Sequence, residues 1–235
     1  MLYCLFDIDG TLLNSGGAGQ AAMEEAVLTL AEQPKDMNGI STAGRTDRAI
    51  ISDLFERFEI SLDEENWQRF LNTYLELLPR NLHEREGVVL PGVSQLLDAI
   101  SQLEEVELGL LTGNFREGAR LKLEHFDLFH HFSFGAYGDV HTHRNEVAKV
   151  AYDEVSRRHG SEIEPERIWI VGDTPADVEC ARAIGAHVAA VCTGVYSRET
   201  LEATKPDMLF DDFSAPQHLL NCLKWNRPFN PYFKT

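Results

Sequence analysis

The feature that most constrains the fold is a short apolar segment near the N-terminus that ends on acidic residues. Leu2 to Phe6 form an uninterrupted hydrophobic run of strand length, and Asp7, Asp9 and the turn-forming pair Gly10-Thr11 follow it directly. Such a run is typical of a buried strand in a parallel sheet, and ligands bind outside the carboxyl ends of these strands. We therefore expect this segment to deliver Asp7 and Asp9 to a binding site.

The two acids should point to the same side of the strand, with Ile8 turned away into packing. Two neighbouring carboxylates raise each other's pKa unless a cation neutralises them, and a hard divalent metal with oxygen ligands does this well. The alternative interpretation is a polar turn after a strand, because Asp and Gly are common turn residues. The rest of the chain bears on this choice.

Composition limits the function classes. The chain has 235 residues, enough for one large domain or a core with an insertion, and its 43% hydrophobic and 25% charged residues are ordinary for a soluble globular protein. A net charge of −17 disfavours nucleic acid as a partner but permits a small phosphorylated metabolite beside a local metal. No apolar run has membrane-spanning length and no leader pattern is seen, so we expect a cytoplasmic monomer or homodimer without a membrane partner. The four cysteines lack Cys-x-x-Cys spacing and are expected to be free thiols.

Hydrophobic periodicity changes twice along the chain. Residues 16–85 carry helical stripes almost throughout, the last introduced by a capping-box spacing at Ser61 to Glu64, whereas strand-like and helix-like segments alternate after Val88. Alternation of this kind predicts an α/β fold: a Rossmann-like three-layer core with a parallel sheet, formed by residues 1–15 and 86–235, and an inserted all-helical cap at 16–85. Strands are expected at 106–111, near 132–136, and at 168–171, 188–192 and 208–210, and the last helix from about Ser214.

Two further strands also end on polar motifs. Thr112, Gly113 and Asn114 follow the strand at 106–111, where a hydroxyl and free backbone amides could bind an anion, although an ordinary helix cap is the alternative. Asp173 and Asp177 follow the strand at 168–171, within Gly-Asp-Thr-Pro-Ala-Asp. Asp173 could instead be an ordinary turn residue, and Asp177 an acid at a helix start that interacts favourably with the helix dipole.

A basic residue near a helix start is a further candidate. Arg144 precedes the helix expected at 145–159, an unfavourable place for a cation relative to the helix dipole, and Lys149 one turn later is its competitor. The His residues between positions 130 and 143 have no acids or thiols in metal-ligand spacing nearby, so a surface loop is favoured there over a metal site.

Together, the four motifs resemble those of the haloacid dehalogenase-like (HAD) hydrolases, most of which are phosphatases. Asp7-x-Asp9-Gly-Thr matches the first motif, Thr112-Gly113-Asn114 the second, and Gly-Asp173-Thr-Pro-x-Asp177 the fourth. Arg144 stands for the third, where the family more often has Lys followed by Pro. The helical insertion lies where this family places its C1-type cap, and Gly44-Arg45-Thr46-Asp47 within it resembles a cap segment of phosphoglycolate phosphatase-like members.

The resemblance implies a mechanism. Asp7 would be the nucleophile that forms an aspartyl-phosphate, and Asp9 would protonate the leaving oxygen and then deprotonate water. Members that are dehalogenases or phosphonatases lack the second acid, so Asp9 points to phosphate esters. Mg²⁺ would be bound by Asp7, the main-chain carbonyl of Asp9 and Asp173, with Asp177 as a ligand or as support.

The remaining motif residues would bind substrate. By the same resemblance, Thr112, the amides of Gly113 and Asn114, and Arg144 would hold the phosphoryl oxygens. Arg45 could meet a substrate carboxylate or phosphate, or simply precede a helix that Thr46 caps. A phosphomutase of the β-phosphoglucomutase type and a non-catalytic binding protein are the alternative functions.

Overall fold

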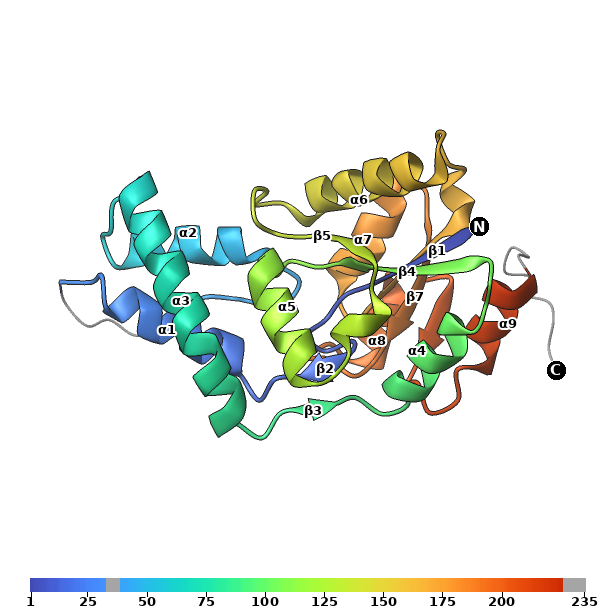
Figure 1. Ribbon diagram of the computed structural model, residues 1–235, viewed down its shortest axis with the longest axis horizontal. Helices are drawn as coiled ribbons and strands as arrows, with labels where there is room; N and C mark the ends of the chain where they lie inside the picture. The colour runs from blue at the N-terminus through green and yellow to red at the C-terminus, as the bar shows by residue number, and fades with distance from the viewer. Residues whose placement is uncertain (33–38, 226–235) are drawn as a thin grey trace.

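A computed structural model describes residues 1–32 and 39–225 of the protein. Figure 1 shows a sheet with helices around it and, beside it, a separate group of helices. Residues 33–38 of the predicted cap and 226–235 of the predicted core lie outside the described residues. No described helix has the length and hydrophobicity needed to span a membrane.

The main sheet confirms the predicted α/β fold class. Its strands run in the order β5-β4-β1-β6-β7-β8, and every neighbouring pair is parallel. The strands are β1 (Leu2–Phe6), β4 (Val106–Leu111), β5 (Phe134–Ala136), β6 (Ile168–Gly172), β7 (His187–Val191) and β8 (Met208–Phe210). Strands β4 and β5 extend the sheet on one side of β1, and β6, β7 and β8 extend it on the other. Open α/β sheets bind ligands at such a topological switch point.

Side-chain alternation along β1 produces three layers. Leu2, Cys4 and Phe6 pack into an apolar cluster with helices α4, α5 and α9, whereas Tyr3 and Leu5 pack on the opposite face against α6 and α7. The helices that belong to this part are α4 (Val93–Ser101), α5 (Arg116–His125), α6 (Arg144–His159), α7 (Pro175–Ile184), α8 (Arg198–Ala203) and α9 (Gln217–Trp225).

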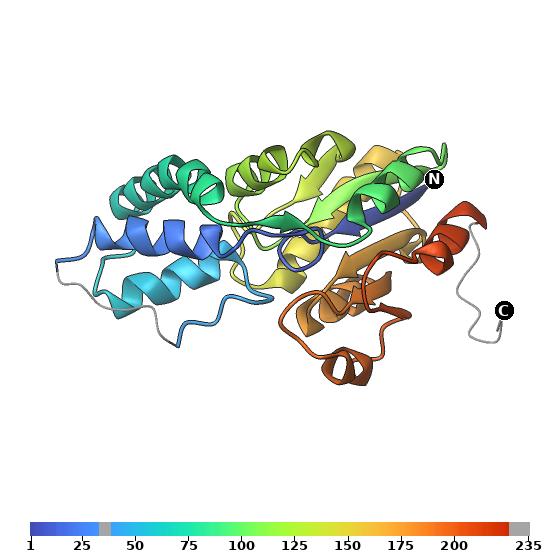
Figure 2. The same ribbon diagram turned by 90° about the horizontal axis from the view of Figure 1, so that it is seen from below.

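The helical segment is built around a second apolar cluster, which also includes Phe115 from the sheet part. Helices α1 (Ala18–Leu28), α2 (Asp47–Arg57) and α3 (Glu64–Glu84) bury a cluster that includes Phe55, Phe70 and Tyr74. In Figure 2 these helices again lie to one side of the sheet. The chain passes between the two parts at β2 (Leu13–Asn14) and β3 (Val88–Val89), which pair antiparallel near the predicted boundaries at 15 and 85. We call α1 to α3 the cap.

Several element limits differ from the sequence predictions. Helix α3 begins at Glu64, because the Asp63 carboxylate accepts a hydrogen bond from the Asn66 backbone N–H at 2.9 Å. The N-cap residue of this helix is therefore Asp63 and not Ser61. The last helix begins at Gln217, three residues after the predicted Ser214. Strands β2 and β3 were not predicted, since two residues are too few to show alternation.

One residue joins the cap to the sheet part through reciprocal hydrogen bonds. The backbone N–H of Asp47, the first residue of α2, donates to the Gly113 carbonyl at 2.7 Å, and its carboxylate accepts from the Phe115 N–H at 2.9 Å. A Cβ at Gly113 would lie 2.0 Å from the carbonyl oxygen of Arg45, so the backbones meet directly here. Asp47 therefore ties the start of α2 to the loop after β4.

The pH dependence of stability tests this contact. Burial raises the pKa of Asp47 to about 7, against the opposing effects of Lys122 and the Phe115 N–H. The native state thus keeps a proton that the unfolded chain releases near pH 4, and Asp47 costs the protein stability as pH rises from about 4 to about 7. Asp47→Asn does not titrate and can still accept from Phe115. Measured by urea unfolding, its stability relative to the parent should increase across this window, and a constant difference would contradict the buried carboxylate.

Candidate active site

The carboxyl ends of β1, β4 and β6 open into a cavity of about 370 Å³ between the sheet edge and the cap. Motif residues from all parts of the chain line it. They are Asp7, Asp9, Gly113, Asn114, Arg144 and Asp173 from the sheet part, together with Arg45 and Asp47 from the cap. Folding therefore brings together acids that lie more than 160 residues apart in sequence, as the Thr11 to Asp173 hydrogen bond also shows.

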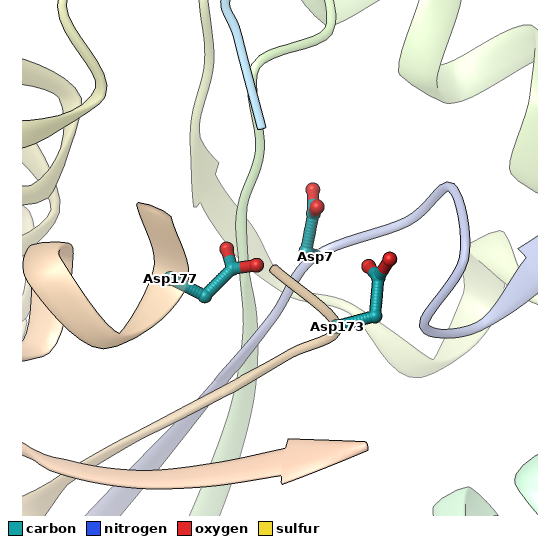
Figure 3. A group of neighbouring side chains, drawn as sticks. All are labelled: Asp7, Asp173 and Asp177. Atoms are coloured by element: carbon teal, nitrogen blue, oxygen red, sulfur yellow. The ribbon is translucent and has the colours of Figure 1, made fainter. Parts of the chain in front are cut away.

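Three buried carboxylates form the centre of the site. Ligand oxygens of Asp7, Asp173 and Asp177 all lie within 4.8 Å of one another, and Figure 3 shows Asp177 reaching from the first turn of α7 toward Asp7. Burial, followed by repulsion from Asp177 and Asp7, raises the pKa of Asp173 to about 8. Burial likewise raises the pKa of Asp177 to about 6, although Arg144 opposes this shift. The cluster therefore has more negative charge than the neighbouring residues neutralise.

Asp177 also stabilises its own helix. Its Oδ2 accepts from the backbone N–H of Thr174 at 3.0 Å and from the Thr174 hydroxyl at 2.7 Å, while Oδ1 accepts from Arg144 at 2.5 Å. Both carboxylate oxygens of Asp177 are thus hydrogen-bonded. Asp177 completes the capping box of α7 and also belongs to the acid cluster. The Asp173 carboxylate accepts a hydrogen bond from the Thr11 hydroxyl at 2.9 Å, and glycines at positions 10 and 194 leave space for it.

Arg144 connects two of these acids. It is the first residue of α6, it is buried, and its guanidinium donates to Asp7 Oδ2 at 3.2 Å as well as to Asp177. The carboxylates of Asp177 and Asp7 outweigh the effect of burial and raise the pKa of Arg144, so the side chain stays charged. Its competitor Lys149 is 58% exposed and pairs with Glu146 at 2.8 Å, outside the cavity.

A second network surrounds Asp9. Lys122 of α5 donates to Asp9 Oδ2 at 2.6 Å and to Asn114 Oδ1 at 2.7 Å, and the Asn114 amide donates to both Asp9 Oδ2 and Thr112 Oγ1 at 2.9 Å. Burial alone would raise the pKa of Asp9, but the Lys122 ammonium and side-chain hydrogen bonds with Lys122, Asn114 and Ser15 outweigh it, and the pKa lies below its ordinary value. Thr112 does not cap α5, whose N-cap is Phe115.

Arg45 lies at the cavity wall but is already paired. Its guanidinium donates to Asp53 at 2.6 Å and to the Ser41 carbonyl at 3.1 Å, and the Thr46 hydroxyl caps α2 by accepting from the Ala49 N–H at 3.2 Å. Thr46 is therefore the N-cap of α2, as the alternative interpretation of this segment expected. Arg45 also borders the cavity.

Sequence reasoning missed Lys122 and gave Asp47 no role of its own within the Gly44 to Asp47 segment. Lys122 lies in the last turn of an amphipathic helix, where a lysine normally faces water, and nothing in its spacing distinguishes it. Asp47 is the first residue of a helix, where an acid is common. The unusual property of both residues is burial, which depends on the contact between cap and sheet.

The acid cluster fits a hard divalent cation. Its carboxylate oxygens are close together and buried. Among the described residues, no Lys or Arg forms a salt bridge with Asp173, the third member of the cluster. A bound Mg²⁺ would relieve the repulsion that raises the pKa of Asp173. The donor set contains oxygen only, which suits Mg²⁺ better than a softer metal.

Comparisons with known proteins agree with this geometry. The sequence model of the haloacid dehalogenase-like hydrolases matches residues 4–191. A phosphoglycolate phosphatase of Pseudomonas putida is 25% identical and the match covers 90% of this chain and 76% of the relative, while one of Salmonella typhimurium is 25% identical with 89% and 88% covered. The crystal structure of CbbY from Rhodobacter sphaeroides in complex with phosphate has 19% identity, covers 92% of this chain and 96% of its own, and has a TM-score of 0.72.

The family match spans well over half of the chain and includes the strand, the acids and the cap segment discussed above. The same fold is found in structures of low sequence identity. The chain belongs to the haloacid dehalogenase-like hydrolases.

Proposed function

We propose that the chain is a Mg²⁺-dependent phosphatase that hydrolyses a small phosphomonoester through an aspartyl-phosphate on Asp7. The observation that carries the proposal is the meeting of Asp7, Asp9, Arg144 and Asp173 at one cavity, with Asp177 close behind them. Membership of the family and the names of the phosphoglycolate phosphatase relatives support hydrolysis of a phosphoric monoester. The cavity, about 370 Å³ in volume, suits a small metabolite.

The residues divide into two groups with separate tasks. Asp7 and Asp173, with the Asp9 carbonyl, would hold Mg²⁺, which neutralises phosphoryl charge when bound. Asp177 is better suited to support, because its Oδ1 would have to leave Arg144 in order to bind a metal. Arg144 donates a hydrogen bond to Asp7, and its planar guanidinium would neutralise phosphoryl oxygens.

The reaction proceeds by two in-line displacements. A carboxylate oxygen of Asp7 attacks phosphorus as the bond to the leaving oxygen breaks, and Asp9 gives that oxygen a proton. Asp9 then takes a proton from water as the water oxygen attacks phosphorus and releases Asp7. The Thr112 hydroxyl and the amides after it would hold the phosphoryl oxygens, while the cap limits entry of water.

The phosphomutase alternative uses the same first step and differs in the fate of the phosphoryl group. A screen of small phosphorylated metabolites for release of inorganic phosphate distinguishes a phosphatase from a phosphomutase. A phosphatase releases phosphate in equal amount to the alcohol, whereas a mutase yields an isomerised sugar phosphate without it.

Metal removal should abolish hydrolysis. Excess chelator should stop phosphate release, and added Mg²⁺ should restore it. The three carboxylates would repel a phosphoryl dianion unless a divalent metal ion neutralised them. Circular dichroism of the chelated protein should match that of the parent. Full turnover by protein shown to be free of metal would contradict the proposal.

Loss of the buried guanidinium should be costly. Arg144→Ala should lower kcat by roughly 10²–10³-fold, the usual effect of removing one donor to a developing charge. Lys149→Ala on the same helix serves as the matched control, because Lys149 is exposed and outside the cavity. If the Lys149 variant is the inactive one, the assignment of the basic residue is wrong.

Substitution of the two acids should separate the half-reactions. Asp7→Asn should leave no turnover and no phosphoenzyme, since an amide cannot form the aspartyl-phosphate. Asp9→Asn should phosphorylate Asp7 from an aryl phosphate and then stall, with hydrolysis slowed by roughly 10²–10⁴-fold. Intact mass should reveal a phosphoryl group that hydroxylamine removes. A phosphoryl group on Asp9 in the Asp7 variant would reverse the two assignments.

A further inference from the structure

Lys122 is a buried lysine whose charged end faces the active-site cavity. Only 6% of its side chain is exposed, and it extends from α5 to reach Asp9 and Asn114. A buried ammonium is costly unless it is paired and hydrogen-bonded, and here both conditions are met. The residue lies in none of the sequence motifs, and the mechanism above does not use it.

The direction of each hydrogen bond follows from chemistry. An ammonium group only donates, so the Asn114 atom that faces it must be the carbonyl oxygen Oδ1. The amide nitrogen of Asn114 is thereby turned toward Asp9 Oδ2 and Thr112 Oγ1, each at 2.9 Å. Lys122 thus fixes the orientation of Asn114 as well as contacting Asp9 directly.

This arrangement determines which oxygen of Asp9 can carry a proton. Asp9 Oδ2 faces the Lys122 ammonium and the Asn114 amide, neither of which can accept a hydrogen bond. A proton on Oδ2 would point at two donors, so the acid form must carry it on Oδ1. The Thr112 oxygen likewise accepts from Asn114, which leaves its hydrogen free to donate to a phosphoryl oxygen.

We propose that Lys122 is a positioning residue for general acid and base catalysis. It holds Asp9 Oδ2, so that Oδ1 exchanges protons with the leaving oxygen and then with water, and through Asn114 it orients the Thr112 hydroxyl. Lys122 itself neither gains nor loses a proton in the reaction. The inference rests on the phosphatase reaction proposed above.

The first turn of α1 provides a second way to disturb Lys122. Gly19 packs on it, and a Cβ at this position would lie 3.1 Å from Nζ and 3.2 Å from Cε. Gly19→Ala would therefore crowd the ammonium without removing its charge. Alanine is also a better helix former than glycine, so this variant is expected to fold.

The test compares two esters of similar size, benzyl phosphate and p-nitrophenyl phosphate. The benzyl alkoxide is a poor leaving group that needs a proton, whereas p-nitrophenolate leaves with little help. Lys122→Met should lower the ratio of kcat/KM for benzyl to p-nitrophenyl phosphate by about 10²-fold, because only the first ester depends on Asp9 as an acid. Lys122→Arg, which keeps the donor, should recover part of the ratio, and Lys149→Met on α6 should leave it unchanged.

Gly19→Ala should lower the same ratio in the same direction, and it decides the matter if Lys122→Met does not fold. A ratio that stays within about twofold of the parent in the folded variants, with both esters slowed equally, would show that Lys122 only stabilises the structure. A parent enzyme that releases phosphate from neither ester would contradict the proposed function, and this inference with it.

Discussion

The structure depends on how negative charge is held at the carboxyl end of β1. Asp7 and Asp9 follow this strand, and folding adds Asp173 and Asp177 beside them. Two buried cations oppose the repulsion: Arg144 contacts Asp7 and Asp177, and Lys122 contacts Asp9. Removing one partner of a buried pair such as Arg144 and Asp7 typically costs about 3–5 kcal/mol. The pair of Lys122 and Asp9 contributes less, because the Asp9 side chain is 41% exposed and solvent screens it.

The two cations also separate the acids by function. Arg144 comes from α6 and holds the side of the site where Asp7 lies close to Asp173 and Asp177. Lys122 comes from α5 and holds the side where Asp9 meets the loop after β4. Asp7 and Asp9, only two residues apart, therefore experience different environments, as the separate roles proposed for them require.

The cap contributes to this second side. Asp47 binds the loop after β4 at Gly113 and Phe115, and Gly19 packs against Lys122. The backbone that presents Thr112 is thus in contact with α2, and the residue that positions Asp9 is in contact with α1. Any displacement of the cap would therefore disturb the surroundings of Thr112 and Asp9 together, in addition to opening the cavity.

The sequence predicted those features that depend on local patterns. The apolar run before Asp7, the strand before Asp173 and the helical stripes of 16–85 were each visible within a few residues, and they led to the correct fold class. The placement of Arg144 near Asp7 agreed with its position at a helix start. Lys122 and Asp47 could not be found in this way, because their importance arises from burial between segments that are distant in sequence.

The limits of the elements were predicted less well where the competing signals were local. Ser61 and Asp63 are both good N-cap residues, and in the structure it is Asp63 whose carboxylate accepts from the Asn66 N–H. The alternative readings of Asp177 and Thr46 as helix caps describe real hydrogen bonds in the structure. A residue near an active site can cap a helix and serve the site at once, so the two interpretations were not exclusive.

The most direct test of the account is how the phosphoryl group partitions between water and an added alcohol such as ethylene glycol. If every ester passes through the same aspartyl-phosphate on Asp7, the ratio of inorganic phosphate to phosphorylated glycol must be identical for substrates with different leaving groups. The account predicts one constant ratio for benzyl and p-nitrophenyl phosphate. A ratio that changes with the leaving group would mean that water attacks the substrate directly, and would contradict the covalent role of Asp7.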